Sequence, residues 1–106
     1  MLIANRDVAV FTPDLASAET FYDELFGAAP SERSDGHLRY DSGPLCLYVV
    51  KAAEPRGWTP SFDTPDAART RERLLALGCE ALTDGDGGGH FRDPFGFVFD
   101  VLERRS

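Results

Sequence analysis

The chain has 106 residues, a length typical of one domain, with 42% hydrophobic and 27% charged residues. No apolar run approaches the roughly 18 residues of a membrane-spanning helix, which argues against membrane insertion. The formal net charge of -7 argues against a nucleic-acid partner, which needs a basic surface, and mildly favours cationic partners.

The N-terminal half begins with a predicted strand over residues 7–11. The sequence MLIANR before it lacks the basic-then-apolar layout of a signal peptide, so we expect a cytoplasmic protein. A helix should begin after Pro13-Asp14 and end at Gly27, because Asp is a good N-cap and Gly a good C-cap. Its predicted buried face comprises Leu15, Ala18, Phe21, Tyr22 and Leu25. Strands are predicted around residues 29–33, 37–40 and 45–50.

The second half repeats this order after a predicted linker at residues 51–57. A strand over residues 58–63 precedes a helix that opens with Thr-Pro-Asp, as the first helix does, and closes at Gly78. Its predicted buried set is Ala67, Leu74, Leu75 and Leu77. Further strands are predicted at 80–83, 89–93 and 97–102.

These elements predict an α+β fold of one domain, residues 1–106, built from two βαβββ modules at residues 1–50 and 58–106. We expect a curved mixed sheet around a cleft, with the helices on the outer face. Alternation along the strands should place one set of side chains under the helices, namely Val8, Val10, Leu45, Leu47, Val49, Phe97, Phe99 and Val101.

Three stretches carry a resemblance to a known superfamily. They are "DVAVFTPDLASAETFYDELFG", "PDAARTRERLLALG" and "FRDPFGFVFDVLE". The pattern resembles the vicinal oxygen chelate superfamily, which includes glyoxalase I, extradiol dioxygenases and the bleomycin-resistance proteins. The resemblance covers nearly the whole chain and implies the two-module fold predicted above.

The resemblance also implies where ligand-binding residues lie. Metal-using members carry ligands at four places, and the corresponding residues here are Asp7, then Cys46 or Tyr48 depending on register, then Thr59, then Asp100. Both positions that usually hold histidine lack it, and transition metals favour imidazole or thiolate ligands. We therefore predict no bound metal or other cofactor, although two carboxylates with waters could hold magnesium.

Aromatic residues extend the predicted binding set. Phe11 has the parity of Asp7, and Tyr48 has the corresponding place on its strand, so both should face the cleft; Trp58 lies near the junction of the modules. Such rings can stack on a planar or cationic ligand. They can equally pack the interface between the modules.

The remaining polar motifs have ordinary explanations. Cys46 and Cys79 have no metal-binding spacing, and His37 and His90 match no ligand position of the superfamily, so we expect solvent-facing or loop histidines. The sequence DGDGGGH at 84–90 lacks the acids of a calcium loop and the Lys of a phosphate loop, and is predicted to connect two strands.

These observations favour a metal-independent binding protein of the bleomycin-resistance type that holds a small cationic or amphipathic molecule, such as an antibiotic. We expect a homodimer, since superfamily members commonly dimerise and pairing covers sheet edges. One alternative is an enzyme: a lyase, isomerase or dioxygenase with a reduced or atypical metal site, or a metal-free isomerase or cyclase that uses Asp100 as base. The other is a regulatory or partner-binding module without a small-molecule ligand.

Overall fold

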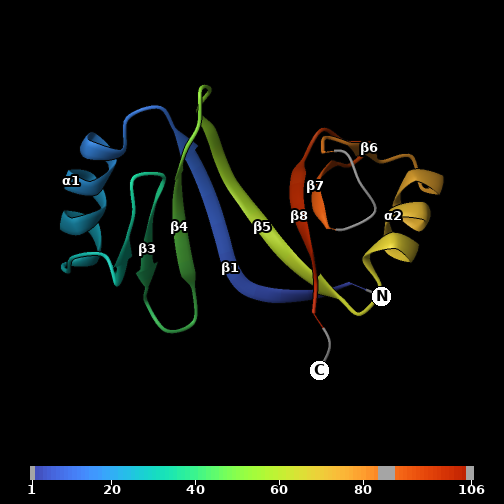
Figure 1. Cartoon of the computed structure of the whole chain (residues 1–106), viewed down its shortest axis with the longest axis horizontal. Coiled ribbons are helices and arrows are strands. Elements are labelled where there is room, and N and C mark those ends of the chain that lie inside the picture. The colour runs from blue at the N-terminus through green and yellow to red at the C-terminus, as the bar shows by residue number, and fades with distance from the viewer. Residues whose placement is uncertain (1, 84–87, 105–106) are drawn as a thin grey trace. The chain divides into compact units, whose positions relative to one another are not determined.

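The computed structural model describes residues 2–83 and 88–104. The described residues form an α+β fold in which strand, helix and three strands follow one another twice, as predicted (Figure 1). The elements are β1 (Ile3–Thr12), α1 (Leu15–Phe26), β2 (Glu32–Arg33), β3 (His37–Asp41), β4 (Cys46–Lys51), β5 (Arg56–Thr64), α2 (Ala67–Ala76), β6 (Glu80–Ala81), β7 (Gly89–Arg92) and β8 (Val98–Glu103).

The chain divides into two compact units. The first unit is Arg6–Thr59, and the second unit is Met1–Asn5 together with Pro60–Ser106. Strands β1 and β5 each contribute residues to both units. Lys51 ends β4 and Arg56 begins β5, so only residues 52–55 of the predicted linker lie outside strands.

The first unit contains four strands in the order β2-β3-β4-β1. Strand β1 runs parallel to β4, and the other neighbours are antiparallel. Helix α1 packs against one face of these four strands and covers a buried core. The side chains at the alternate strand positions lie on the opposite face. The core residues are Val10, Leu38, Tyr40, Leu47 and Val49.

Helix α1 begins and ends where its capping residues predict. The Asp14 side chain accepts a hydrogen bond from the Ser17 backbone N–H at 3.0 Å. Gly27 stops the helix with φ of 66°, a conformation that glycine adopts without steric cost. The buried face differs from the prediction, because Phe21 and Leu25 are 60% and 59% exposed. The helical turn places them beside the core-facing stripe of Leu15, Ala18, Tyr22 and Phe26.

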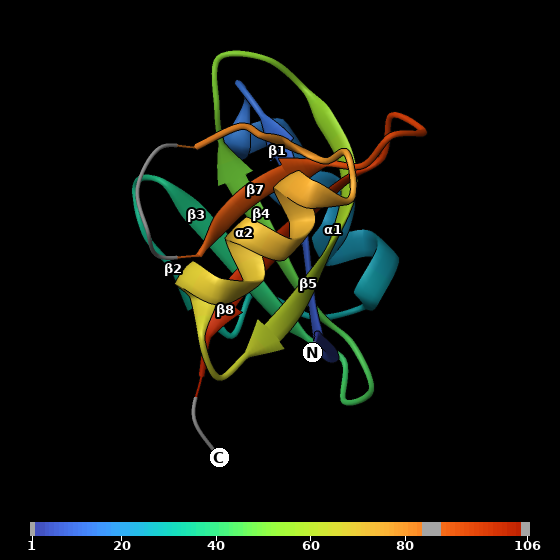
Figure 2. The same cartoon turned by 90° about the vertical axis from the view of Figure 1, so that its right-hand side faces the viewer.

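The second unit contains four strands in the order β5-β8-β7-β6. Strands β5 and β8 are parallel, while β7 pairs antiparallel with β6 and β8. Helix α2 covers one face of β7 and β8 (Figure 2), where Leu74 packs with Phe91 and Val101. Asp66 caps this helix by accepting a hydrogen bond from the Arg69 backbone N–H at 3.1 Å.

The sequence analysis predicted that three apolar residues of the second unit are buried between helix and sheet, and this prediction was wrong. Leu75 and Leu77 are 45% and 60% exposed because the buried stripe of α2 runs through Ala67, Thr70 and Leu74 instead. Phe97 precedes β8 and is 71% exposed, since it belongs to the turn in which its N–H donates to Asp93 Oδ1 at 3.0 Å. Of the predicted connection at 84–90, residues 84–87 lie outside the described residues.

Candidate functional site

A row of polar side chains crosses the second unit on the sheet face opposite α2. Ser61, Asp100 and His90 are register neighbours on β5, β8 and β7. The flanking residues Phe99 and Val101 point the other way, into the core under α2. Alternation along β8 therefore turns Asp100 away from the helix, as the sequence predicted. We call Asn5, Ser61, Asp63, His90 and Asp100 the Asp100 face.

Asn5 fixes one end of the Asp100 face. Its Nδ2 donates to Ser61 Oγ at 3.2 Å and to Asp63 Oδ1 at 2.8 Å. The same Asp63 oxygen lies 3.5 Å from Arg104 Nε, in a half-exposed ion pair. The amide thereby orients a carboxylate and a buried hydroxyl on the strand next to Asp100.

The carboxylate of Asp100 has an unusual environment. Its Oδ1 is buried and accepts no hydrogen bond within the described residues. His90 Nδ1 nevertheless lies 2.9 Å from this oxygen, and the two side chains are 28% and 19% exposed. We read the contact as an ion pair that forms when the imidazole is protonated, because its alignment is not that of a hydrogen bond. Asp100 therefore retains acceptor capacity that a ligand can use.

Two glycines allow the backbone before His90 to approach its neighbours. A Cβ at Gly88 would overlap the backbone oxygen of Val101, and one at Gly89 would overlap Thr83 Oγ1. Thr83 Oγ1 in turn accepts a hydrogen bond from the His90 N–H at 3.1 Å. The approach at Gly88 holds the start of β7 against β8, and the approach at Gly89 holds it against Thr83; together they position His90 beside Asp100.

In the first unit, the face opposite α1 carries most of the other predicted ligand-binding residues. Asp7 is the register neighbour of Cys46, and Ala9 that of Tyr48, so both candidate residues of β4 share the face of Asp7. The Tyr48 hydroxyl accepts a hydrogen bond from Arg39 Nε at 3.2 Å.

Two predicted residues are deeply buried. Cys46 has 0% exposure and Thr59 has 1%, and the Thr59 hydroxyl donates to the Gly57 carbonyl at 3.1 Å. Their side chains pack the sheet in the structure as it stands. Their direct contact with a ligand stays a prediction.

An arginine–carboxylate pair stands at the edge of the same face. Arg6 Nη1 and Nη2 donate to the two oxygens of Asp41 at 2.8 and 2.9 Å. Hydrogen bonds from Arg6 and from the Gly43 backbone hold the pKa of Asp41 well below its ordinary value. This carboxylate is therefore satisfied within the chain, in contrast to Asp100.

Phe11 and Trp58 lie together at an aromatic cavity of about 470 Å³, which Phe21 and Tyr22 also line. Trp58 is 56% exposed, so part of its ring is open to a ligand. The Arg56 guanidinium lies 5.0 Å from the centroid of the Phe11 ring, within cation–π range. The cavity thus offers aromatic faces that already accommodate one cation.

The sequence-derived site set falls into both units. Asp7, Phe11, Cys46, Tyr48, Trp58 and Thr59 belong to the first unit, and Asp100 belongs to the second. That Asp7 and Asp100 face one shared cleft stays a prediction. The sequence analysis did not predict that His90 belongs to the site. The only signal was that His90 and Asp100 could be opposite each other in a β7–β8 hairpin, and this depends on a register that the sequence alone did not provide.

His37, by contrast, does not approach a site carboxylate within the described contacts. Its Nδ1 lies 2.7 Å from Ser34 Oγ and its Nε2 lies 3.0 Å from Glu32. It thus stabilises a turn and the β2–β3 edge, close to the solvent-facing role expected for it.

The donors in the described residues do not fit a bound transition metal. Within residues 2–83 and 88–104, no three His, Cys, Asp or Glu side chains come together to hold a metal ion. His90 and Asp100 supply two donors, while structural and catalytic zinc sites use three or four protein ligands. No step is therefore assigned to a metal here.

None of the described helices has the length and apolar character to cross a membrane.

Comparison with known protein families shows to which family this chain belongs. The model of the Glyoxalase-like domain matches residues 7–102. The chain belongs to the glyoxalase-like domain family. In this glyoxalase-like domain, Asp100 lies on β8, the last strand of the described residues. Comparison with curated proteins gave no match.

Solved structures similar to this glyoxalase-like domain share its fold. The NAD-dependent benzaldehyde dehydrogenase from Legionella pneumophila is 19% identical with a TM-score of 0.70, and the alignment covers 93% of this chain and 98% of that one. Homoprotocatechuate 2,3-dioxygenase from Brevibacterium fuscum, in complex with 3,4-dihydroxyphenylacetate, is 20% identical with a TM-score of 0.64, covering 99% of this chain. The Mn(II)-bound glyoxalase from Novosphingobium aromaticivorans is 19% identical with a TM-score of 0.65, covering 97% of this chain.

The last two alignments span only 37% and 40% of the relatives' own chains. Both relatives belong to the glyoxalase and extradiol dioxygenase, or vicinal oxygen chelate, superfamily that the sequence resembles. The likeness at this identity establishes the fold of the glyoxalase-like domain.

Proposed function

We propose that this glyoxalase-like domain is a metal-independent binding protein of the bleomycin-resistance type, which holds a small cationic or amphipathic molecule. The observation that carries the proposal is the buried Asp100 Oδ1, which accepts no hydrogen bond within the described residues. A buried acceptor left without a donor costs free energy, about 1 to 3 kcal/mol, so a ligand N–H or O–H that reaches it gains that much.

The neighbours of Asp100 favour a cationic donor. Asp63 adds a second carboxylate to the same face, and Asn5 holds it in place at 2.8 Å. An ammonium or guanidinium group can bind a carboxylate with charge-assisted hydrogen bonds, which are about twice as strong as neutral ones. The net charge of -7 also attracts a cation over a longer range.

The aromatic cavity of the first unit supports a ligand with a planar part. Its exposed ring at Trp58 and the neighbouring Phe11 offer stacking surfaces. Its volume of about 470 Å³ lies within the range of small-molecule sites, roughly 300 to 1,000 Å³.

The second candidate function is acid–base catalysis by the His90–Asp100 pair. The distance of 2.9 Å between Nδ1 and Oδ1 favours it, because a carboxylate beside Nδ1 stabilises the imidazolium that forms when His takes a proton. An isomerase or a cyclase needs such a base. In that case His90 exchanges the proton and Asp100 positions the ring.

The test begins with metal analysis of protein purified without chelator or metal-affinity resin. A stoichiometric metal that survives dialysis contradicts the proposal and points to the enzyme with an atypical metal site. Metal-free protein is then screened by thermal shift against cationic antibiotics, including bleomycin, since a ligand that binds only the folded state raises the melting temperature. Proton NMR of each bound compound over time separates a binder, which leaves it unchanged, from an enzyme, which converts it.

We also propose that the domain works as a homodimer. Phe95 and Phe97 at the turn before β8 are 83% and 71% exposed, and exposed aromatic residues of this kind often lie at protein interfaces. A partner that covers them removes apolar surface from water.

A further inference from the structure

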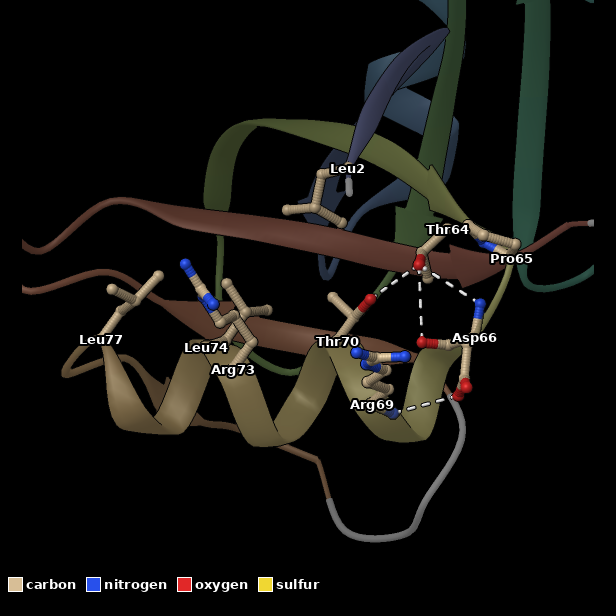
Figure 3. Close-up of a pocket in the computed structure, with 9 residues that line it drawn as sticks. All are labelled: Leu2, Thr64, Pro65, Asp66, Arg69, Thr70, Arg73, Leu74 and Leu77. Atoms are coloured by element: carbon tan, nitrogen blue, oxygen red, sulfur yellow. Dashed lines mark hydrogen bonds between the residues drawn. The ribbon is translucent and has the colours of Figure 1, made fainter.

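A second cavity, of about 660 Å³, lies beside α2 in the second unit (Figure 3). Its apolar wall comprises Leu2, Pro65, Leu74 and Leu77. Leu2 lies across the cavity from the helix in the close-up view. The wall is thus built from the start of the chain and from α2, at the margin of the core in which Leu74 packs, whereas the Asp100 face lies on the opposite side of the sheet from α2.

The hydroxyls of this cavity are engaged with the protein. Thr64 Oγ1 lies 2.6 Å from Thr70 Oγ1, and both residues are buried. Thr64 Oγ1 also accepts from the Asp66 N–H at 3.4 Å. These bonds fix the first turn of α2 to the end of β5, and they leave the charged groups as the polar features available to a ligand.

Two arginines of α2 line the cavity. Arg69 and Arg73 are exposed, and neither guanidinium has an ion pair or hydrogen bond within the described residues. Other arginines do have carboxylate partners, for example Arg92 with Glu80 at 2.7 Å. A spacing of four residues places Arg69 and Arg73 on the same side of the helix, about 6 Å apart along its axis.

We propose that this cavity is a binding site for a small organic carboxylate with an apolar chain. Guanidinium groups bind carboxylates through paired, charge-assisted hydrogen bonds. The leucine wall removes the apolar chain from water, which contributes roughly 0.8 kcal/mol for each buried CH₂ group. This site is independent of the proposed cationic ligand of the Asp100 face.

The charges of the cavity set the orientation of the ligand. Asp66 lies at the N-terminal end of α2 and repels an anion, while Arg73 lies about two helical turns away (Figure 3). The carboxylate therefore binds Arg73, while Arg69 lies between Arg73 and Asp66 along the helix. The apolar chain of the ligand lies along Leu74 and Leu77. An alkylammonium ion of the same length lacks the attraction and does not bind here.

The test uses octanoate as probe and the amide resonances of the full chain as readout. Octanoate should shift the amides of Leu2, Thr70, Arg73, Leu74 and Leu77 saturably, and octylammonium should not. Arg73→Gln should weaken octanoate binding about tenfold, the expected loss for one charge-assisted contact. Lys51→Gln, an equal charge change at an exposed position outside this cavity, should leave the Kd unchanged.

Asp66→Asn provides a gain-of-affinity test, because Asn caps helices as well as Asp does but carries no charge. It should tighten octanoate binding while α2 stays folded. The proposal is overturned if octanoate gives no saturable shifts, if octylammonium shifts the same amides equally, or if Arg73→Gln binds like the wild type. Shifts of these amides on simple dilution would instead show that a second copy of the chain occupies the cavity.

Discussion

His90 and Asp100 lie side by side on β7 and β8, with His90 Nδ1 2.9 Å from Asp100 Oδ1. The contact makes Asp100, an acid between Phe99 and Val101, part of a polar row with Ser61. Asp100 keeps a buried oxygen that accepts no hydrogen bond within the described part of the chain. The binding and the catalytic proposals both depend on this pair, and they differ in what His90 does.

Gly88→Ala should disrupt the pair by moving the start of β7. A Cβ there would overlap the backbone oxygen of Val101, which a rigid neighbouring strand cannot withdraw. We expect a loss of stability of about 2 to 4 kcal/mol, measured by urea unfolding. Gly36→Ala is the matched control, because nothing lies within 4 Å of its added Cβ. Equal stability of the two variants would contradict the close approach at Gly88.

Tyr40→Phe should change how stability depends on alkaline pH. Tyr40 is buried, and its hydroxyl donates to Asp23 Oδ1 at 2.7 Å. Burial and this carboxylate raise the pKa of Tyr40 above its ordinary value of about 10. As pH rises, the Tyr40 hydroxyl therefore loses its proton first in the unfolded chain. The contribution of Tyr40 to the free energy of unfolding is complete below about pH 10 and declines above it.

In Tyr40→Phe this alkaline decline should be shallower than in the wild type, while stability at neutral pH falls by about 1 to 2 kcal/mol with the lost hydrogen bond. Urea unfolding at about pH 7 and about pH 11 measures both effects. Tyr22→Phe, which keeps Tyr40, serves as control. A wild-type slope in Tyr40→Phe would show that Asp23 and burial do not protect the phenol.

Arg6→Gln should release the carboxyl of Asp41. The bidentate contact at 2.8 and 2.9 Å is the main reason that the pKa of Asp41 lies below its ordinary value of about 3.9. Its contribution to stability is present above that ordinary value and is lost as pH falls through the lower, folded one. NMR titration of the carboxyl carbon should show a higher pKa in Arg6→Gln and no change in the control Arg92→Gln.

The sequence predicted most of the fold because its signals were local. The two Thr-Pro-Asp openings mark helix starts, and Asp14 and Asp66 both act as N-caps. The exposure of apolar residues next to element ends was harder to predict, since Leu77 and Phe97 are as apolar as the core residues but lie just beyond α2 and just before β8. Hydrophobicity alone does not show where a strand or helix stops.

The site was predictable only in part. Alternation along β8 was sufficient to turn Asp100 away from the helix. The pairing with His90 depends on the register of β7 against β8, and a slip of one residue in that register would turn His90 to the other face of the sheet. The burial of Cys46 depends on the strands on both its sides, and those contacts are not local.

Phe95→Ser combined with Phe97→Ser should convert the proposed dimer to monomer. Both rings are largely exposed at the turn before β8, so the change removes apolar contact area without opening a core cavity. Light scattering after size exclusion measures the mass. Leu25→Ser, a similarly exposed apolar position on α1, is the control. A monomeric wild type, or a double variant that remains dimeric, would contradict this interface.

The proposed cation site at Asp100 is tested most directly by measuring how tightly Asp100→Asn binds a cationic antibiotic that stabilises the wild type. The affinity is measured by calorimetry in metal-free buffer. We expect at least about a tenfold loss of affinity, because the variant removes the charge that the cation binds. Asp35→Asn, at an exposed turn position, changes the net charge equally and should bind like the wild type. Unchanged affinity in Asp100→Asn, or an equal loss in Asp35→Asn, would contradict a cation site at Asp100.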